Sequence, residues 1–274
     1  MQYTERAPHP SLLSIVRCIW TFDSSADDGS PEMQRVVPDG CPEIILHYGE
    51  RCSEVNARGQ IEQQSRFLFA GQMSQPLLLQ PSVQAGMIGI RLQSAGARML
   101  LGIPMRETTN VRLDLAAIWT QAGDDLVDAV RNARCSGERV QIVERFLQKK
   151  MSQLRIEPDA AVAHAVALLQ GAAGRISVDE IAKQWALSQR QLERRFLNEV
   201  GFPPRLLASI FRFRRVFDLL EKSDLWASRA IDAGYFDQPH MIRDFKRFSG
   251  QQPQAFFQSL NGLGRAMARG DVAY

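Results

Sequence analysis

Apolar and polar positions divide the chain into a first part with short apolar runs and a second part with helical patterns. In the first part, runs of two to six apolar residues are bounded by Gly, Pro and polar residues, which favours strands over helices. These runs cover residues 36–37, 44–46, 67–69, 77–79 and 87–92. Segment 94–101 has the pattern of a short helix that ends at Gly102. The first part is therefore predicted to be β-rich.

A turn is predicted directly after the first of these runs. Pro38, Asp39 and Gly40 follow one another there, and Pro fixes φ while Gly permits a positive φ. The predicted strand 44–46 begins a few residues later.

The second part begins near Asp124, where apolar residues start to recur three and four positions apart. They are Leu126, Val130, Val140, Val143, Phe146, Leu147 and Met151. This spacing predicts amphipathic helix, with a break near Ser136 and Gly137. From Asp159 onward almost the whole chain has a helical pattern, and Pro158 marks the boundary.

We expect four segments from these patterns. Residues 1–122 form a β-rich domain, and residues 123–157 form a helical connector that is a candidate for dimerisation. Residues 158–262 form an all-α domain, and residues 263–274 form a C-terminal tail. The fold class is α+β.

A short signature occurs twice in the helical part. The first copy has Ala182, Leu192, Phe196, Gly201 and Pro204. The second copy has Ala230, Met241, Phe245, Gly250 and Pro253. The gaps from the Leu or Met onward are identical, and 48 residues separate the two Ala residues, so the signature predicts a repeated supersecondary unit.

Capping boxes predict what each unit is. Ser177 with Glu180 opens a helix over 178–185, and Ser188 with Gln191 opens a second helix over 189–200. Two short helices, a tight turn and a small Ala182 in the first helix indicate a helix-turn-helix. Its predicted core is Ile181, Trp185, Leu187, Leu192 and Phe196.

The second copy has the same plan. Its first helix is predicted over 226–233, Gly234 lies in the turn, and Pro239 lies in the first turn of the second helix, where a missing N–H costs little. Tyr235, Phe236 and Phe248 are expected in the core. A single helix over 204–222, roughly 28 Å long, connects the two units and suits successive major grooves of DNA.

The outward faces of the two second helices favour DNA over a protein partner. With Leu192 and Phe196 inward, the outward residues are Gln189, Arg190, Glu193 and Arg194. In the second unit the polar residues are Gln238, His240, Arg243, Lys246 and Arg247. Recognition helices contact base edges from their N-terminal residues, and Arg pairs with guanine in bidentate fashion. Arg212, Arg214, Arg215 and Lys222 on the connecting helix are either phosphate contacts or a solvated face.

Composition adds little to this picture. The chain has 274 residues, 45% of them apolar, and a formal net charge of +3. Residues 1–154 hold 16 basic and 17 acidic residues, and residues 155–274 hold 17 and 13, so the positive charge lies in the helical part. Widely spaced Cys18, Cys41, Cys52 and Cys135 without a secretory signal indicate reduced thiols in the cytoplasm. No apolar run is long enough for a membrane helix.

The segment from Gly234 to Gly250, followed by Pro253, resembles the signature of the AraC/XylS transcription regulators. Residues 191–196, Gln-Leu-Glu-Arg-Arg-Phe, fit the first helix-turn-helix of that family. The resemblance covers residues 158–258. It implies a cytoplasmic regulator that binds double-stranded DNA, acts as an activator with RNA polymerase, and forms a homodimer. It also implies that DNA-facing residues include Arg190, Glu193 and Arg194 in the first unit and His240, Ile242 and Arg243 in the second.

Three positions depart from the family pattern. Ala186 stands where a turn Gly is common, and Arg195 and Arg229 occupy positions that are often apolar. These departures concern local packing, and Arg195 is a further candidate for a phosphate contact.

The first part resembles the uncharacterised domain that is often found ahead of this DNA-binding module. The resemblance rests on residues 37–43, 70–72, 89–91 and 102–107. It implies sensing of a small-molecule effector, or dimerisation, through a fold distantly similar to cupins. The effector itself is not implied.

An alternative from another class remains open. Asp39, Cys41, Glu43 and His47 lie within nine residues, and Cys41, Glu43 and His47 share one face of a strand. They form either a metal or thiol sensor or an enzyme site, with the helical part as an accessory, or they are ordinary residues of a turn and an edge strand. Arg91 and Arg106 either hold an anionic effector or form structural salt bridges.

We predict a sequence-specific transcriptional regulator with DNA-contacting residues Gln189, Arg190, Glu193, Arg194, Gln238, His240, Ile242, Arg243 and Lys246. No catalytic set, metal site or cofactor is expected. A nonspecific DNA binder is the third interpretation, because phosphate contacts alone bind any sequence.

Overall fold

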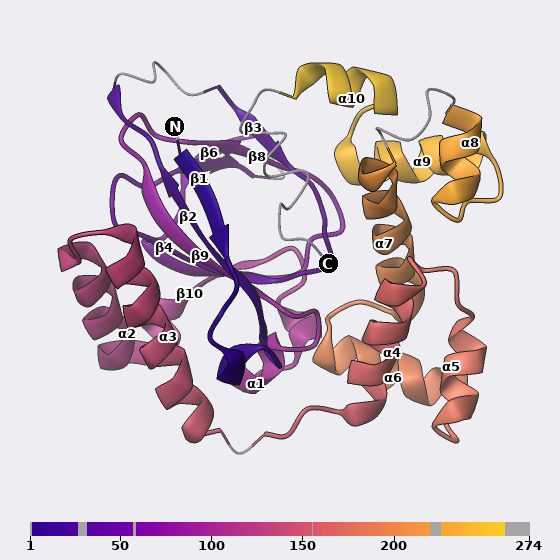
Figure 1. The fold of residues 1–274 in the computed structure, drawn as a ribbon, viewed down its shortest axis with the longest axis horizontal. Coiled ribbons are helices and arrows are strands. Elements are labelled where there is room, and N and C mark those ends of the chain that lie inside the picture. Colours follow the sequence, from indigo (N-terminus) through magenta and orange to yellow (C-terminus); the bar gives the residue numbers. More distant parts are fainter. Residues whose placement is uncertain (1, 27–31, 57–58, 155, 220–225, 261–274) are drawn as a thin grey trace.

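The computed structural model describes residues 2–26, 32–56, 59–154, 156–219 and 226–260. Strands fill the first part of the chain and helices the second, and the two halves lie side by side (Figure 1). The expected α+β class, with a β-rich N-terminal half and a helical C-terminal half, is confirmed. The expected C-terminal tail, 263–274, lies outside the described residues.

In the described part of the chain, ten strands form two antiparallel sheets. The larger sheet has the order β1, β2, β9, β4, β7, β10, and the smaller has the order β3, β8, β5, β6. The strands are β1 Gln2–Arg6, β2 Val16–Asp23, β3 Gln34–Val36, β4 Glu43–His47, β5 Ser53–Val55, β6 Ile61–Gln63, β7 Phe67–Ala70, β8 Leu77–Gln80, β9 Gly86–Leu92 and β10 Arg112–Asp114. All five apolar runs predicted as strands lie in or next to strands. A double-sheet arrangement also occurs in jelly rolls such as cupins.

The larger sheet is the middle layer of the β-rich half. Along β4, Ile44 and Leu46 belong to the core on one face, whereas Glu43 and Ile45 line a cavity on the other. The same alternation occurs in β9, where Ile88 faces the core and Met87 faces the cavity. The smaller sheet closes the cavity from the opposite side.

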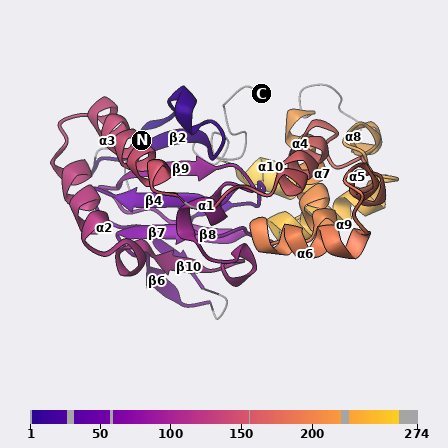
Figure 2. The same ribbon diagram turned by 90° about the horizontal axis from the view of Figure 1, so that it is seen from below.

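Two helices, α2 Leu115–Asn132 and α3 Ser136–Ser152, cover the outer face of the larger sheet (Figure 2). Trp119 of α2 lies between Phe67 of the sheet and Phe146 of α3, with ring centroids 5.6 and 5.3 Å apart. The predicted break near Ser136 is confirmed. However, α2 begins at Leu115, capped by Asp114, so the position expected to end the β-rich domain, 122, lies inside a helix.

The helical half contains both predicted helix-turn-helix units. Its helices are α4 Ala160–Gly171, α5 Val178–Gln184, α6 Gln189–Glu199, α7 Pro204–Asp218, α8 Trp226–Asp232, α9 Gln238–Ser249 and α10 Pro253–Ser259. The pair α5 and α6 forms the first unit, and α8 and α9 form the second. Both predicted capping boxes are present, at Ser177 and at Ser188. The short helices outside this half are η1 Pro10–Leu12, α1 Ala97–Leu101 and η3 Met105–Glu107.

Helix α7 joins the cores of the two units. Leu207 and Phe211 pack with the first unit, whereas Phe213 and Phe217 pack with the second. The connecting helix was expected to reach residue 222, but it ends at Asp218 and is therefore about 22 Å long rather than 28 Å. Lys222 lies outside the described residues.

Two aromatic residues expected in the core are not there. Trp185 is the C-cap of α5, is 40% exposed, and donates from its indole N–H to Nδ1 of His164 at 2.9 Å. Phe236 is 88% exposed. Each of these residues lies where a helix has ended or not yet begun, so the helical periodicity that predicts burial does not apply.

The departures from the family pattern are accommodated within the chain. Ala186 adopts a positive φ of 51° in the first turn, a conformation that costs a non-Gly residue about 1 kcal/mol. Arg195 lies 3.5 Å from Asp159, the N-cap of α4, and the guanidinium of Arg229 lies 4.6 Å from the centre of the Trp226 ring. Arg195 therefore has a partner inside the protein.

The β-rich half contacts the helical half at both helix-turn-helix units. The turn at Gly40, which has a φ of 81°, packs so closely on α7 that an added Cβ would lie 2.9 Å from Leu207. Thr109 donates to the carbonyl of Gly201 at 2.9 Å, and Arg98 pairs with Glu199 at the end of α6. The last two contacts hold the C-terminal end of α6 against the β-rich half.

Among the described residues, no helix is both long and apolar enough to cross a membrane.

Candidate nucleic-acid interface and inner cavity

The first candidate recognition helix, α6, begins at a reciprocal cap. The Gln191 N–H donates to Oγ of Ser188 at 3.3 Å, and the Ser188 N–H donates back to Oε1 of Gln191 at 2.8 Å. Leu192 and Phe196 are fully buried, which fixes the opposite side of the helix toward solvent. The free N-terminal end of α6 therefore points away from the β-rich half, whereas its C-terminal end is docked on it (Figure 2).

The four predicted residues of α6 divide into two kinds. Arg190 and Arg194 are exposed, and no ion pair joins either of them to another described residue. Gln189 and Glu193 are half-buried and bonded to each other, because the Gln189 amide donates to Oε1 of Glu193 at 3.0 Å. The two guanidinium groups lie one turn apart on one face, which is the arrangement that base readout needs.

The second candidate recognition helix, α9, is capped by Asp237, whose Oδ1 accepts from the His240 N–H at 2.7 Å. Pro239 lies in the first turn, as predicted. Met241, Phe245 and Phe248 are buried and turn the remaining residues outward.

The five predicted residues of α9 are exposed to different degrees. Arg243 and Lys246 are exposed, and Gln238 is half-buried at the first position of the helix. The His240 ring packs edge-on against Tyr235 at 5.1 Å and lies 4.0 Å from Asp244. Ile242 packs partly on the core of this unit, so only part of it faces outward.

Arg212, Arg214 and Arg215 of α7 lie against other parts of the protein. Arg212 donates to the Gly174 carbonyl at 2.8 Å and to Ser209, and Arg215 lies 3.3 Å from Asp218. Arg214 lines the inner cavity. Intramolecular contacts thus occupy Arg212 and Arg215, for which the sequence left phosphate contacts or a solvated face open.

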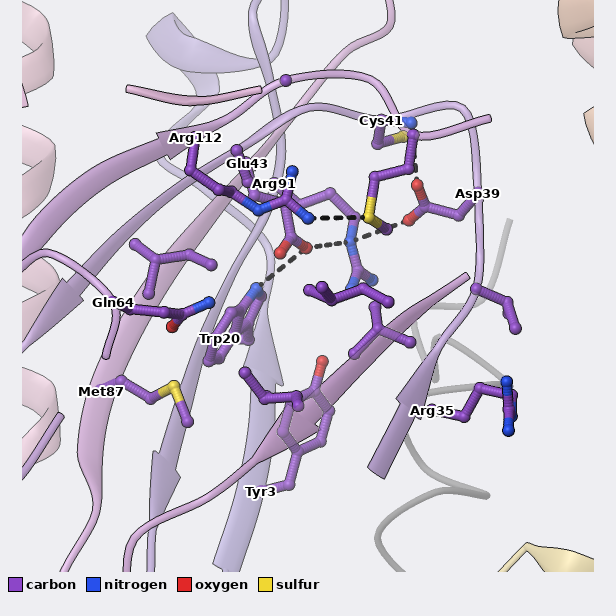
Figure 3. A pocket seen from close by; sticks show the side chains of 18 of the residues that line it. Tyr3, Trp20, Arg35, Asp39, Cys41, Glu43, Gln64, Met87, Arg91 and Arg112 are labelled. Carbon is purple, nitrogen blue, oxygen red and sulfur yellow. Dashed lines mark hydrogen bonds and ion pairs between the residues drawn. The ribbon is translucent and has the colours of Figure 1, made fainter. Parts of the chain in front are cut away.

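The inner cavity lies between the two sheets and has a volume of about 90 Å³ (Figure 3). Apolar and aromatic side chains form most of its wall, and polar groups converge from both halves of the chain. The polar and aromatic residues that line it are Tyr3, Trp20, Arg35, Asp39, Glu43, Gln64, Arg91, Arg112 and Arg214.

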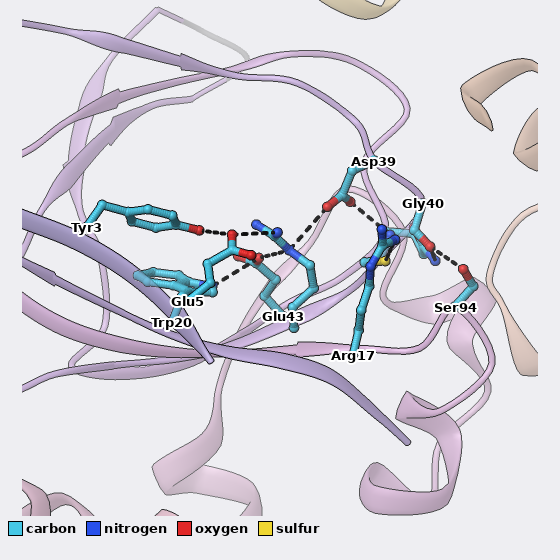
Figure 4. Close-up of polar contacts among 11 residues, drawn as sticks. Tyr3, Glu5, Arg17, Trp20, Asp39, Gly40, Glu43 and Ser94 are labelled. Carbon is cyan, nitrogen blue, oxygen red and sulfur yellow. Dashed lines mark hydrogen bonds and ion pairs between the residues drawn. The ribbon is translucent and has the colours of Figure 1, made fainter. Parts of the chain in front are cut away.

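Arg91 is the centre of a buried charge network in this wall (Figure 4). Its guanidinium lies 3.2 Å from Glu5, 3.3 Å from Asp39 and 2.8 Å from Glu43. The Trp20 indole N–H donates to the same Glu43 oxygen at 3.2 Å. Burial raises the pKa of Glu43, and Arg91 opposes that shift. The interpretation of Arg91 as a structural salt bridge is thus confirmed.

Arg106, the other arginine considered for an anionic effector, lies outside the cavity. It is more than half exposed, lies 3.6 Å from Glu107, and donates to Asn198 of α6 at 3.4 Å. It belongs to the contact between the two halves.

The cluster proposed as a metal or thiol site does not assemble. Cys41 is buried, accepts from Arg17 at 3.6 Å, and has its pKa raised to about 11 by burial, the opposite of what a reactive thiol requires. His47 shares the strand face of Glu43 but bonds to Gln64 at 3.1 Å. Within the described ranges, no three His, Cys, Asp or Glu side chains are grouped as metal ligands.

His47 should make the stability of the protein depend on pH. Burial lowers its pKa to about 4, whereas the unfolded chain binds this proton near pH 6.5. Stability should therefore be complete above pH 6.5 and fall as the pH drops toward 4, by up to about 3 kcal/mol. Urea unfolding between pH 4 and 8 measures this loss. His47→Gln should flatten the curve, and identical pH profiles for the two proteins would contradict the assignment.

Sequence reasoning missed most of the cavity. Tyr3, Glu5 and Trp20 come from strands that the apolar runs did not reveal, and the partners of Glu5 and Trp20 lie more than 20 residues away. Arg35, Arg112 and Arg214 carried no signal beyond their charge. Spacing along the chain gives no information about groups that only a closed double sheet brings together.

Two families match the chain. Residues 4–114 match a domain of unknown function, DUF6597, and residues 181–259 match the family described as a helix-turn-helix domain. No curated protein matches.

Three solved structures are distantly similar. A structure of ToxT from Vibrio cholerae has 11% identity over 96% of this chain and 100% of its own, with a TM-score of 0.49. A transcriptional regulator from Chromobacterium violaceum, described as AraC-type, has 23% identity over 41% and 95%, with a TM-score of 0.33. The C-terminal domain of AraT, a response regulator from Geobacillus stearothermophilus, has 21% identity over 37% and 87%, with a TM-score of 0.35.

Proposed function

We propose that α6 and α9 enter two successive major grooves of one DNA site. The proposal starts from the chain being a DNA-binding transcriptional regulator with an AraC-type helix-turn-helix domain. The observation that carries this proposal is the pair of capped helices, each with a buried apolar face and exposed arginine, whose cores share α7. One continuous helix between two such units favours binding on one face of the duplex.

Roles are proposed for the individual residues. Arg190, Arg194 and Arg243 read bases, because they are exposed on the faces opposite the buried residues. Lys246 contacts a phosphate. The half-buried residues Gln189, Glu193, Gln238, His240 and Ile242 shape the surface and contribute contacts through the atoms that remain exposed.

The inner cavity is the proposed site of a small-molecule effector. Its walls suit a ligand with an apolar body and a polar group, which Arg35 is placed to meet, whereas Arg112 lies 3.5 Å from Glu54. The cavity also adjoins the DNA-binding half. Asp39 lines it, the next residue, Gly40, packs on α7, and Arg214 of α7 lines it from the other side.

The boundary between the proposed regulatory part and the proposed DNA-binding part follows from this arrangement. The regulatory part comprises the two sheets with α2 and α3, since these helices share the core of the larger sheet, and the DNA-binding part comprises 158–262. We further propose that the protein catalyses no reaction, acts in the cytoplasm, forms a homodimer and contacts RNA polymerase when bound to DNA.

Selection of bound sites from random DNA tests the proposed function. The expected result is a site with two conserved blocks whose centres lie about one helical turn, ~10 base pairs, apart. A single block, or enrichment of no sequence over random DNA at fixed salt, would contradict double readout. The second outcome would instead favour nonspecific binding through phosphates.

A further inference from the structure

Phe236 is the most exposed large apolar side chain among the described residues, at 88%. The backbone before it explains this exposure. Gly234 has a φ of 91°, and the Tyr235 N–H donates to the Ala230 carbonyl at 2.9 Å, which closes the turn and buries the Tyr235 ring. Phe236, the next residue, is directed outward. Burying this ring against a partner would gain about 2 kcal/mol.

Phe236 lies at the tip of a candidate recognition helix. The next residue, Asp237, is the N-cap of α9, and its carboxylate is occupied by the His240 N–H. The ring therefore stands in front of the helix end from which base contacts are made. Gln238 and the exposed Arg243, both proposed to contact DNA, follow within seven residues on the same helix.

We propose that Phe236 is a specificity-determining residue that packs on the 5-methyl group of a thymine at the edge of the major groove entered by α9. This inference rests on the proposed function. An apolar side chain at the N-terminal end of a recognition helix discriminates thymine through its methyl group, the one apolar feature of a base edge in the major groove. The contact buries a ring that the free protein leaves in solvent.

The experiment uses the DNA site obtained by selection, with each thymine replaced in turn by uracil, which removes only the methyl group. For the unmodified protein, one replacement should weaken binding about three- to tenfold. Phe236→Ala should weaken binding to the thymine site by a similar factor and be insensitive to that same replacement. The coupling between the protein and DNA changes identifies the contact.

Ile61→Ala is the matched control, because Ile61 is 62% exposed but lies on β6 in the β-rich half. It should leave the affinity unchanged. Because Phe236 is exposed, its replacement should also leave the urea midpoint unchanged, which separates the effect from misfolding.

Several outcomes would overturn the proposal. One is a site in which no thymine responds to uracil, and another is a Phe236→Ala protein that binds as tightly as the unmodified one. Loss of transcription with unchanged DNA affinity would assign the ring to a protein partner instead. If selection yields no site at all, the proposed function fails; if a site is found and Phe236 has no effect on it, only this inference fails.

Discussion

Replacing Arg190 and Arg194 together with Ala is expected to lower the affinity for the selected DNA site by about 2–6 kcal/mol. Each specific base contact is worth about 1–3 kcal/mol, and the two side chains lie one turn apart on the exposed face of α6. Binding isotherms at one fixed salt concentration measure this loss. The fold should be unaffected, because the buried face of α6 is formed by Leu192 and Phe196.

Arg195→Ala is the matched control for this prediction. Arg195 lies on the same helix and carries the same charge, but it lies 3.5 Å from Asp159. Its replacement should weaken binding to specific and random DNA by similar small factors. An unchanged isotherm for the double variant, or an equal loss on random DNA, would show that the two arginines do not read bases.

Arg98→Met is expected to destabilise the contact between the β-rich half and α6 by about 3 kcal/mol. It would leave the carboxylate of Glu199, which is 4% exposed, buried without its counter-charge. Removing one member of a buried ion pair costs more than the pair contributes. Burial already raises the pKa of Glu199, and the loss should therefore shrink as the pH falls and the carboxyl group becomes neutral.

Urea unfolding and protease cleavage of the segment between α3 and α4 would measure this effect. The double variant Arg98→Met with Glu199→Met is the control, because it removes both charges and should recover most of the stability. If the single and double variants were equally stable, the ion pair would not hold the two halves together.

The sequence predicted the helical half better than the β-rich half, for a physical reason. Capping boxes at Ser177 and Ser188 and the turn at Gly234 are local, since each depends on residues within a few positions. The repeat then located both units without any knowledge of the fold. Trp185 and Phe236 were placed wrongly because helical periodicity was extended into the turns, where side-chain directions change.

In the β-rich half, the decisive contacts join residues far apart in the chain. Arg91 pairs with Glu5, Asp39 and Glu43, which lie 86, 52 and 48 positions away. A charged residue such as Arg91 within an apolar run needs a partner of opposite charge, and a structural salt bridge was one of the two interpretations offered by the sequence. Which residues supply the partner depends on the order of strands in the sheet, which apolar patterns do not encode.

The shared helix α7 has a consequence for the DNA that the protein accepts. Leu207 and Phe211 pack with the core of one unit, and Phe213 and Phe217 with the core of the other, so neither unit can rotate without breaking that packing. The rotation of α6 relative to α9 about the axis of the bound DNA is therefore fixed. Each base pair added between the two halves of a site turns one half by about 35° relative to the other. The protein should therefore tolerate sequence changes within a half-site far better than changes in the spacing between half-sites.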